Sequence, residues 1–391
     1  MPIRLSCDGV DMHVAEIRER LRLAGAAPIH EQYLLSQWAQ GAASPGKRRL
    51  EDFLPRTLRE ALPQLEADLA ALVALRSVHP SEDGSERLLL GLRDGQTIEG
   101  VLLPREGLCV STQVGCAVGC VFCMTGRTGL IRQIGSAEIV AQVVLGRQRR
   151  PVRKVVFMGM GEPAHNLDAV LEAIDLLGTS GAIGHKNLVF STVGDLRVFE
   201  RLPQGPVKPA LALSLHTTNA ALREQLLPRA PRITPEELVA LGDDYARRTG
   251  YPIQYQWTLL EGINDGPAEF DGIVRLLKGH YAVLNLIPFN TVDDLPYQRP
   301  TWEQAREIAR DLHRRGVLTK LRQSAGQDIE GGCGQLRARA ARIKSLRPAR
   351  AAEAGRGDDN ARPDEPAGPT PEADRSGRDV RPSDDGAGRI N

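Results

Sequence analysis

The chain has 391 residues, of which 41% are hydrophobic and 25% charged, and its formal net charge is +1. This length accommodates one large domain with smaller attachments, and the composition is that of a globular protein, which excludes fibrous classes. Charged residues interrupt the first twenty positions, and no later apolar run approaches the ~20 residues that span a bilayer. We therefore expect a cytoplasmic protein with no signal peptide and no membrane contact.

The first third of the chain is predicted to be an accessory region. Apolar residues recur every three or four positions in MHVAEIRERLRLAGA and TLREALPQLEADLAALVALRSV, which predicts helices over most of residues 12–76. Asp94-Gly95 lies between two apolar runs and predicts a β-hairpin. We expect a helical region over residues 1–80, with Tyr33, Trp38 and Lys47-Arg48-Arg49 as candidate RNA contacts, and a hairpin extension over 81–107.

Residues 108–346 are predicted to form an α/β core. Apolar runs such as KVVFMGMGE, NLVFSTVG and ALALSLH alternate with helical segments, which predicts a parallel sheet with crossover helices, either open or closed into a barrel. Nearly every run ends in polar or small residues. Because active sites of such folds lie at the carboxyl ends of the strands, we expect these residues to converge on one face.

Two further segments stand out by composition. Residues 347–391 are rich in Pro, Gly, Asp and Arg and nearly free of large apolar residues, which predicts a disordered tail. The run RQRRPVRK, residues 147–154, is densely basic. A run of this kind is most often a solvated helix end, with phosphate contact as the alternative.

Three cysteines form the most informative motif. Cys116, Cys120 and Cys123 have the spacing C-x3-C-x2-C in a loop that contains glycine, which allows their thiolates to converge on one metal centre. A structural zinc site usually has a second ligand pair at a distance, and three buried reduced thiols would not need this pattern. Three thiolates on a 4Fe-4S cluster leave one iron open to a small molecule with an amine and a carboxylate.

This motif, with Phe122 before its last cysteine, resembles the signature of the radical S-adenosylmethionine (SAM) superfamily, and Met158–Pro163 resembles the superfamily's SAM-binding loop. The resemblance extends through GLCVSTQVGCAVGCVFCMTGRTGL, FMGMGEP, FSTVG, LALSLH, LEGIND, NLIPFN and DIEGGCGQL, in the order found in the RlmN/Cfr family of RNA adenine methyltransferases. It implies a partial (β/α)6 barrel of the TIM type and identifies the chain as a divergent paralogue. Ala164-His165-Asn166 and Thr217-Thr218 depart from the family's usual sequences.

The resemblance also implies a role for each matching residue. Cys116, Cys120 and Cys123 would hold one 4Fe-4S cluster, and two SAM molecules would be used per turnover. The SAM site would be lined by Gly161, Glu162, Ser191, Ser214, Leu215, His216 and Asn290. Cys333 would carry the methyl group, Cys109 would resolve the protein–RNA adduct through a disulfide with Cys333, and Glu99 would accept a proton.

The implied reaction methylates adenine, at carbon 2, in ribosomal or transfer RNA. Carbon 2 is electron-poor, so addition of a carbon radical held by a cysteine avoids the need for a nucleophilic ring carbon. We expect a monomer that receives electrons from a flavodoxin or ferredoxin. One alternative is a radical SAM enzyme that acts on carbon 8 or on a substrate other than RNA. The others are a catalytically retired RNA-binding factor and a cluster-containing electron carrier. An electron carrier would need neither the SAM loop nor a reactive thiol.

Overall fold

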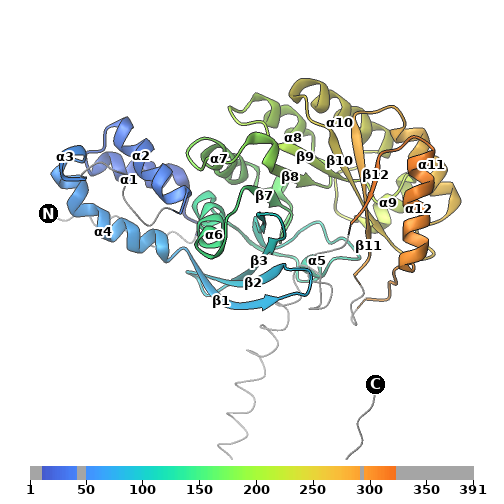
Figure 1. Cartoon of the computed structure of the whole chain (residues 1–391), viewed down its shortest axis with the longest axis horizontal. Coiled ribbons are helices and arrows are strands. Elements are labelled where there is room, and N and C mark those ends of the chain that lie inside the picture. Colours follow the sequence, from blue (N-terminus) through green and yellow to red (C-terminus); the bar gives the residue numbers. More distant parts are fainter. Residues whose placement is uncertain (1–10, 42–49, 291–294, 323–391) are drawn as a thin grey trace, which may run out of the picture. The chain divides into compact units, whose positions relative to one another are not determined.

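The computed structural model describes residues 11–41, 50–290 and 295–322 (Figure 1). Cys333 and the predicted tail lie outside these ranges, so the roles expected of them remain predictions, as do the boundaries of the four predicted segments. Within the described ranges, no helix is long and apolar enough to cross a membrane.

The N-terminal helices form as their apolar spacing predicts. They are α1 (Val14–Leu23), α2 (Pro28–Ala39), α3 (Leu50–Phe53) and α4 (Arg56–Ala70). On α1 the buried residues Val14, Ile17 and Leu21 lie three and four positions apart and pack into the main core.

The predicted helix that continued to residue 76 is wrong in its last part. The chain leaves the helix after Ala70 and forms strand β1 (Val73–Pro80), which pairs antiparallel with β2 (Glu86–Leu92) from Val73 opposite Leu92 to Pro80 opposite Glu86. Pairing with a neighbouring strand outweighs the local helical propensity of this segment.

The predicted hairpin is confirmed. Strand β2 is followed by β3 (Thr97–Leu103), and Gly95 in the turn has φ = 80°, a left-handed conformation that glycine adopts without strain. The backbone N–H of Gln96 donates to Asp94 Oδ1 at 2.9 Å, which fixes the turn.

Ten strands form the main sheet in the order β1-β2-β3-β4-β7-β8-β9-β10-β11-β12. From β4 onward all neighbours are parallel. These strands are β4 (Gly107–Val110), β7 (Lys154–Phe157), β8 (Leu188–Thr192), β9 (Ala210–Ser214), β10 (Ile253–Leu259), β11 (Ala282–Pro288) and β12 (Thr319–Leu321). A separate ladder pairs β5 (Gln113–Gly115) with β6 (Leu130–Gln133).

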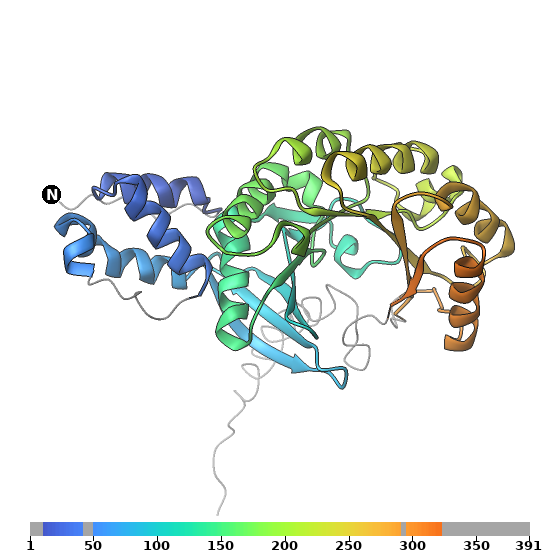
Figure 2. The ribbon, with the colours of Figure 1, turned by 45° about the horizontal axis from the view of Figure 1, so that its top comes forward.

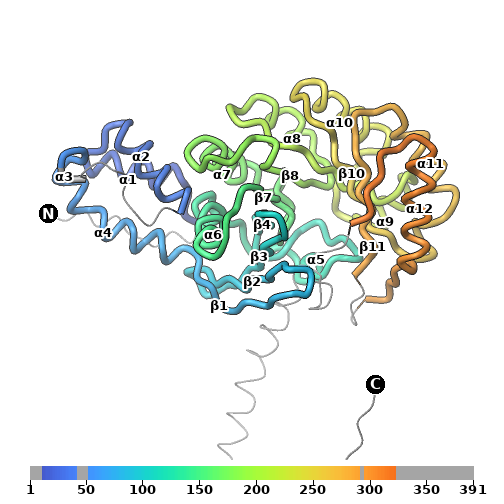
Figure 3. Tube along the Cα trace, in the orientation of Figure 1, coloured from blue at the N-terminus to red at the C-terminus, as the bar shows by residue number. Residues whose placement is uncertain are grey.

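Helices connect the parallel strands, and the path can be followed in Figure 3. The longer ones are α6 (Ser136–Arg149), α7 (Leu167–Gly178), α10 (Pro235–Thr249), α11 (Pro267–Leu277) and α12 (Trp302–Arg314), and the shorter ones are α5 (Met124–Arg127), α8 (Leu196–Arg201) and α9 (Ala220–Leu226). Figure 2 shows the sheet curving, with these longer helices along its outer side. The predicted α/β class is confirmed.

The two faces of the parallel sheet have different chemistry. Val155 and Phe157 of β7 pack into the main core beneath the helices, whereas Val156 belongs with Val189 and Ala210 to a separate small cluster on the opposite face. We call this opposite face the inner face. Alternation along each strand therefore assigns residues to the outer core or to the inner face.

Candidate functional site

The three-cysteine motif lies in a loop closed at its base by the β5–β6 ladder. The backbone N–H of Cys116 donates to Gly129 O at 3.0 Å, and that of Cys123 donates to Cys120 O at 3.0 Å. Gly115 has φ = 84°, and a Cβ added to it would lie 2.0 Å from Gly129 O. Glycine is therefore required where the loop starts, and the loop begins in a fixed conformation.

The three thiols lie close to one another in apolar surroundings. Cys116 is 8% exposed, and burial together with the negative charges of Cys123 and Glu162 raises its pKa to about 12. The pKa of Cys120 is raised by burial and by the charges of Cys123, Cys116 and Glu162. Thiolates in this setting need a cationic partner, and a thiolate-bound iron cluster is one that the donor set fits.

An apolar shell surrounds the cysteine loop. It is formed with Cys116 by Val118, Val193, Leu226, Leu227, Leu260 and Phe289. Such a shell restricts solvent and lowers the local dielectric, and both tune the redox potential of an iron cluster.

Glu162 is fixed beyond β7 by backbone donors from two segments. Its Oε1 accepts the N–H of Ala164 and its Oε2 that of Val193, each at 3.0 Å. The carboxyl is 5% exposed, and burial raises its pKa to about 7. A buried carboxylate in this position is suited to bind an ammonium group, whose charge would lower the pKa again.

The loop that carries Glu162 is also held by the segment after β4. Ser111 Oγ accepts the N–H of Met160 at 2.8 Å, and Gln113 Oε1 accepts that of Glu162 at 2.7 Å. At Gly161, where φ is 102°, an added Cβ would lie 2.6 Å from Gln113 Cβ. The glycine-rich loop thus depends on close backbone approach at Gly161.

His216 lies at the end of β9 and touches the cysteine loop. Its ring meets that of Phe122 edge to face, with 4.9 Å between centroids. Its Nδ1 accepts the N–H of Thr258 at 3.0 Å, and burial lowers its pKa to about 3. The imidazole is therefore neutral and carries its proton on Nε2.

Asn264 secures the backbone of His216, whose φ of 60° is left-handed. Asn264 is fully buried and donates from Nδ2 to His216 O at 2.7 Å and to Thr258 O at 2.8 Å, while its Oδ1 accepts the N–H of Leu260 at 2.8 Å. This amide connects the ends of β9 and β10 and offsets the strain at His216.

The other predicted SAM-site residues also lie at the carboxyl ends of parallel strands. Ser191 is the fourth residue of β8, Ser214 ends β9 and is followed by buried Leu215, and half-buried Asn290 follows β11. These residues therefore lie at one edge of the sheet, as expected for residues at the carboxyl ends of parallel strands.

Arg223 on α9 was not predicted as a site residue. Its guanidinium is 4% exposed and donates to the backbone oxygens of Val193 and Ser214, the latter at 3.1 Å. Burial lowers its pKa to about 10, while the neighbouring Cys120 opposes this shift. Arg223 therefore connects the ends of β8 and β9 beside the cysteine loop. Its partners are backbone carbonyls, which no sequence pattern marks.

Thr217-Thr218, where the sequence departs from the family's usual residues, are bound by a buried glutamate. Glu269 on α11 is 8% exposed and accepts from both threonine hydroxyls and from the N–H of Thr218 at 2.7 Å. A Cβ at Gly272 would lie 2.2 Å from Thr218 Oγ1. The threonines, Glu269 and Gly272 therefore form one packed unit.

Cys109 and Glu99 lie on the inner face. Cys109 of β4 pairs in register with Val101 of β3 and Val156 of β7. Glu99 is two residues before Val101, so it projects to the same side. The structure thus places both on the face that carries Ser191 and Ser214, since Ser191 pairs with Ala212 of the inner cluster.

The basic run at 147–154 is largely engaged within the chain. Arg147 donates to backbone oxygens including Ala39 and Gly181, Arg149 pairs with Glu86 at 2.8 Å, and Arg150 donates to Gly84 O at 2.9 Å. These contacts favour the structural interpretation of the run over phosphate binding by its arginines.

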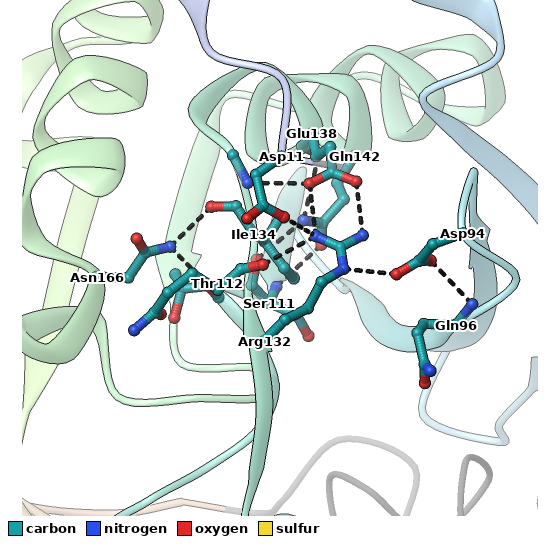
Figure 4. A network of polar contacts seen from close by, with 12 residues as sticks. Asp11, Asp94, Gln96, Ser111, Thr112, Arg132, Ile134, Glu138, Gln142 and Asn166 are labelled. Atoms are coloured by element: carbon teal, nitrogen blue, oxygen red, sulfur yellow. Dashed lines mark hydrogen bonds and ion pairs between the residues drawn. The ribbon is translucent and has the colours of Figure 1, made fainter. Parts of the chain in front are cut away.

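Arg132 on β6 connects the accessory region to the base of the cysteine loop (Figure 4). Its guanidinium lies 2.6 Å from Asp11, 2.6 Å from Asp94 of the hairpin and 2.9 Å from Glu138 of α6. Burial raises the pKa of Glu138 although Arg132 opposes this shift. For Asp94, burial is outweighed by the contact with Arg132, and its pKa is lowered. The hairpin and α6 are thereby held together by one buried cation.

Comparison with known proteins agrees with this geometry. Residues 110–277 match the model of the radical SAM superfamily. A protein of Leptothrix cholodnii named probable RNA methyltransferase is 72% identical over 86% of this chain and 99% of its own length. A similarly named Pseudomonas aeruginosa protein is 66% identical over 84% of this chain and 96% of its own length.

A solved structure shares the fold. The crystal structure of a radical SAM methyltransferase from Sphaerobacter thermophilus is 34% identical, covers 83% of this chain and 98% of its own, and superposes with a TM-score of 0.72. The predictions of fold and superfamily are confirmed. With its cysteine loop, its Glu162 loop and these relatives, the chain belongs to the radical SAM superfamily, in the family of the probable RNA methyltransferases.

Proposed function

We propose that the chain methylates carbon 2 of an adenine in ribosomal or transfer RNA, and that the methyl group passes through Cys333. The observation that carries the proposal is the position of Cys109, on β4 of the inner face that also bears Ser191 and Ser214. We propose that this thiol forms a disulfide with the cysteine that carries the substrate, and its location on the face that bears Ser191 and Ser214 supports this role. The names of the relatives support RNA as the substrate class.

The residues present fit the two cofactors. Cys116, Cys120 and Cys123 would hold one 4Fe-4S cluster in the apolar shell, which supplies, when bound, the electron that cleaves SAM into a radical. The SAM molecules, two per turnover, would be bound by Gly161, Glu162, Ser191, Ser214, Leu215, His216 and Asn290. Glu162 would attract the ammonium group, because its carboxylate is held by two backbone donors.

The remaining steps belong to three side chains. Cys333 would hold the carbon that is added to the ring, and Glu99 would accept the proton that leaves carbon 2, while the one electron left on the ring would return to the cluster. The thiolate of Cys109 would then attack the sulfur of Cys333. The disulfide would form as the bond between that sulfur and the added carbon breaks, and the carbon would take up a proton to become the methyl group of the released RNA. We further propose that the protein acts as a cytoplasmic monomer and receives electrons from a flavodoxin or ferredoxin.

Nucleoside mass spectrometry of RNA from a deletion strain tests the product. Loss of 2-methyladenosine from one RNA, restored by the wild-type gene and not by Cys333→Ala, is the expected result. Loss of 8-methyladenosine would show instead that the protein methylates carbon 8. No change in any modified nucleoside would contradict an RNA substrate.

A further inference from the structure

Three cations that the proposed reaction does not use lie on the inner face. Lys154 begins β7, two residues before the inner-face residue Val156. Leu321 of β12 packs against the outer core, so its neighbours Lys320 and Arg322 project to the inner face. Arg322 Nε donates to Asn285 Oδ1 at 2.8 Å, and Asn285 pairs in register with Lys320.

The sheet that carries the three cations is curved (Figure 2), and the inner face is the face that they share. Strand β7 is far from β12 in the strand order, yet the charges of Arg322 and Lys320, together with burial, lower the pKa of Lys154. Lys154 is half-buried, while Lys320 and Arg322 are exposed. Lys154, Lys320 and Arg322 therefore share the inner face, and we call these three side chains the inner cation cluster.

The inner cation cluster has no acidic partner in the described part of the chain. None of its three members forms an ion pair there, whereas the nearby Arg149 and Arg153 pair with Glu86 and Glu106. Like charges that are held together repel one another, and partial burial increases this cost. An anion bound among them would remove the repulsion.

We propose that Lys154, Lys320 and Arg322 bind a backbone phosphate of the RNA, adjacent to the nucleotide that is methylated. The proposal rests on the proposed function and adds to it a position for the RNA backbone. Cys109 pairs in register with Val156, and Lys154 is two residues away, about 7 Å along the strand. A guanidinium and two ammonium groups are suited to a phosphate at that distance from the target base.

Binding experiments on the full-length protein test this proposal separately from catalysis. The probes are bulk transfer RNA and 23S ribosomal RNA, and the variants are Lys154→Met and Arg322→Met. We expect weaker binding of the RNA that the wild type prefers, and a slope of log K against log salt that is shallower by about 0.7 to 0.9 for each lost phosphate contact. Lys278→Met and Arg310→Met, at exposed positions on the outer helices, should bind RNA as the wild type does.

Thermal unfolding and the methylation assay distinguish the proposal from its alternatives. In the absence of RNA, Lys154→Met should keep or raise the Tm, because repulsion is relieved; a lower Tm would show that the chain itself neutralises the cluster and would overturn the proposal. If inorganic phosphate or pyrophosphate raises the Tm of the wild type and not of the variants, while RNA binding is unchanged, the site takes a free phosphate instead. If RNA binding changes as expected but no RNA is methylated, the proposed function fails and the phosphate site stands.

Discussion

Arg87 Nη1 lies 3.6 Å from Glu99 Oε2, and each side chain is only 1% exposed. The two residues come from neighbouring strands of the accessory hairpin, and Glu99 is the proposed proton acceptor. A buried ion pair of this kind contributes little to the free energy of unfolding. Loss of one member, however, leaves the other charge buried without that partner.

Arg87→Met should therefore destabilise the protein by about 3 to 5 kcal/mol. Urea unfolding measures the change, and the exposed Arg56→Met provides a control that should have little effect. The double variant Arg87→Met/Glu99→Met should recover much of the loss, because both charges are removed. Equal stability of Arg87→Met and wild type would show that the pair does not matter.

Asn264→Asp should be strongly destabilising although the side chain keeps its shape. The replacement places an acceptor against the backbone oxygens of His216 and Thr258, where the amide now donates. We expect a loss of more than about 2 kcal/mol by urea unfolding. Asn219→Asp is the matched control, because Asn219 caps α9 through Oδ1, which accepts the N–H of Leu222, and aspartate caps equally well. Similar losses in both variants would contradict this account.

Arg132→Met should loosen the attachment of the hairpin to α6. The buried carboxylate of Glu138 would lose its cation, which is expected to cost about 3 kcal/mol. Hydrogen exchange should accelerate in β2 and β3, because Asp94 in their turn is released. Arg153→Met, which removes a 77%-exposed guanidinium, should leave exchange unchanged. Faster exchange in both variants would point to a general effect of arginine loss.

The contact between His13 and Glu172 predicts a pH-dependent contribution to stability. The carboxylate of Glu172, 3.6 Å from His13 Nδ1, raises the pKa of His13 above its usual 6.5. The pKa of Glu172 is below its usual 4.5, because its contacts with His13 and Ser136 outweigh its burial. The stabilisation from His13 is complete below pH 6.5 and is lost as the pH rises through the raised pKa. That from Glu172 is present above pH 4.5 and is lost as the pH falls through the lowered pKa.

His13→Asn tests the pH range in which this pair stabilises the protein. The difference in unfolding free energy between wild type and variant should be greater at pH 6 than at pH 8, and Glu172→Gln should show the same trend. A difference that does not vary with pH would exclude an ionic contribution from the pair.

Sequence predicted the parts of the structure that depend on local pattern. The strand at Lys154–Phe157 and the turn at Asp94-Gly95 each follow from residue types over a few positions. Strand β1 was missed because pairing with β2 decided its conformation. Arg223 could not be predicted, because its contacts are backbone carbonyls brought together only by the fold.

The central claim is that the methyl group passes through Cys333, and peptide mass mapping after anaerobic reconstitution tests it most directly. The protein would be incubated with iron, sulfide, SAM and reductant, with total RNA added afterwards, and Cys333→Ala run in parallel. The account predicts one added methyl group on Cys333 and a new methyladenosine in one RNA, with both absent from the variant. A bound cluster and SAM cleavage without a methyl group on Cys333 would contradict it.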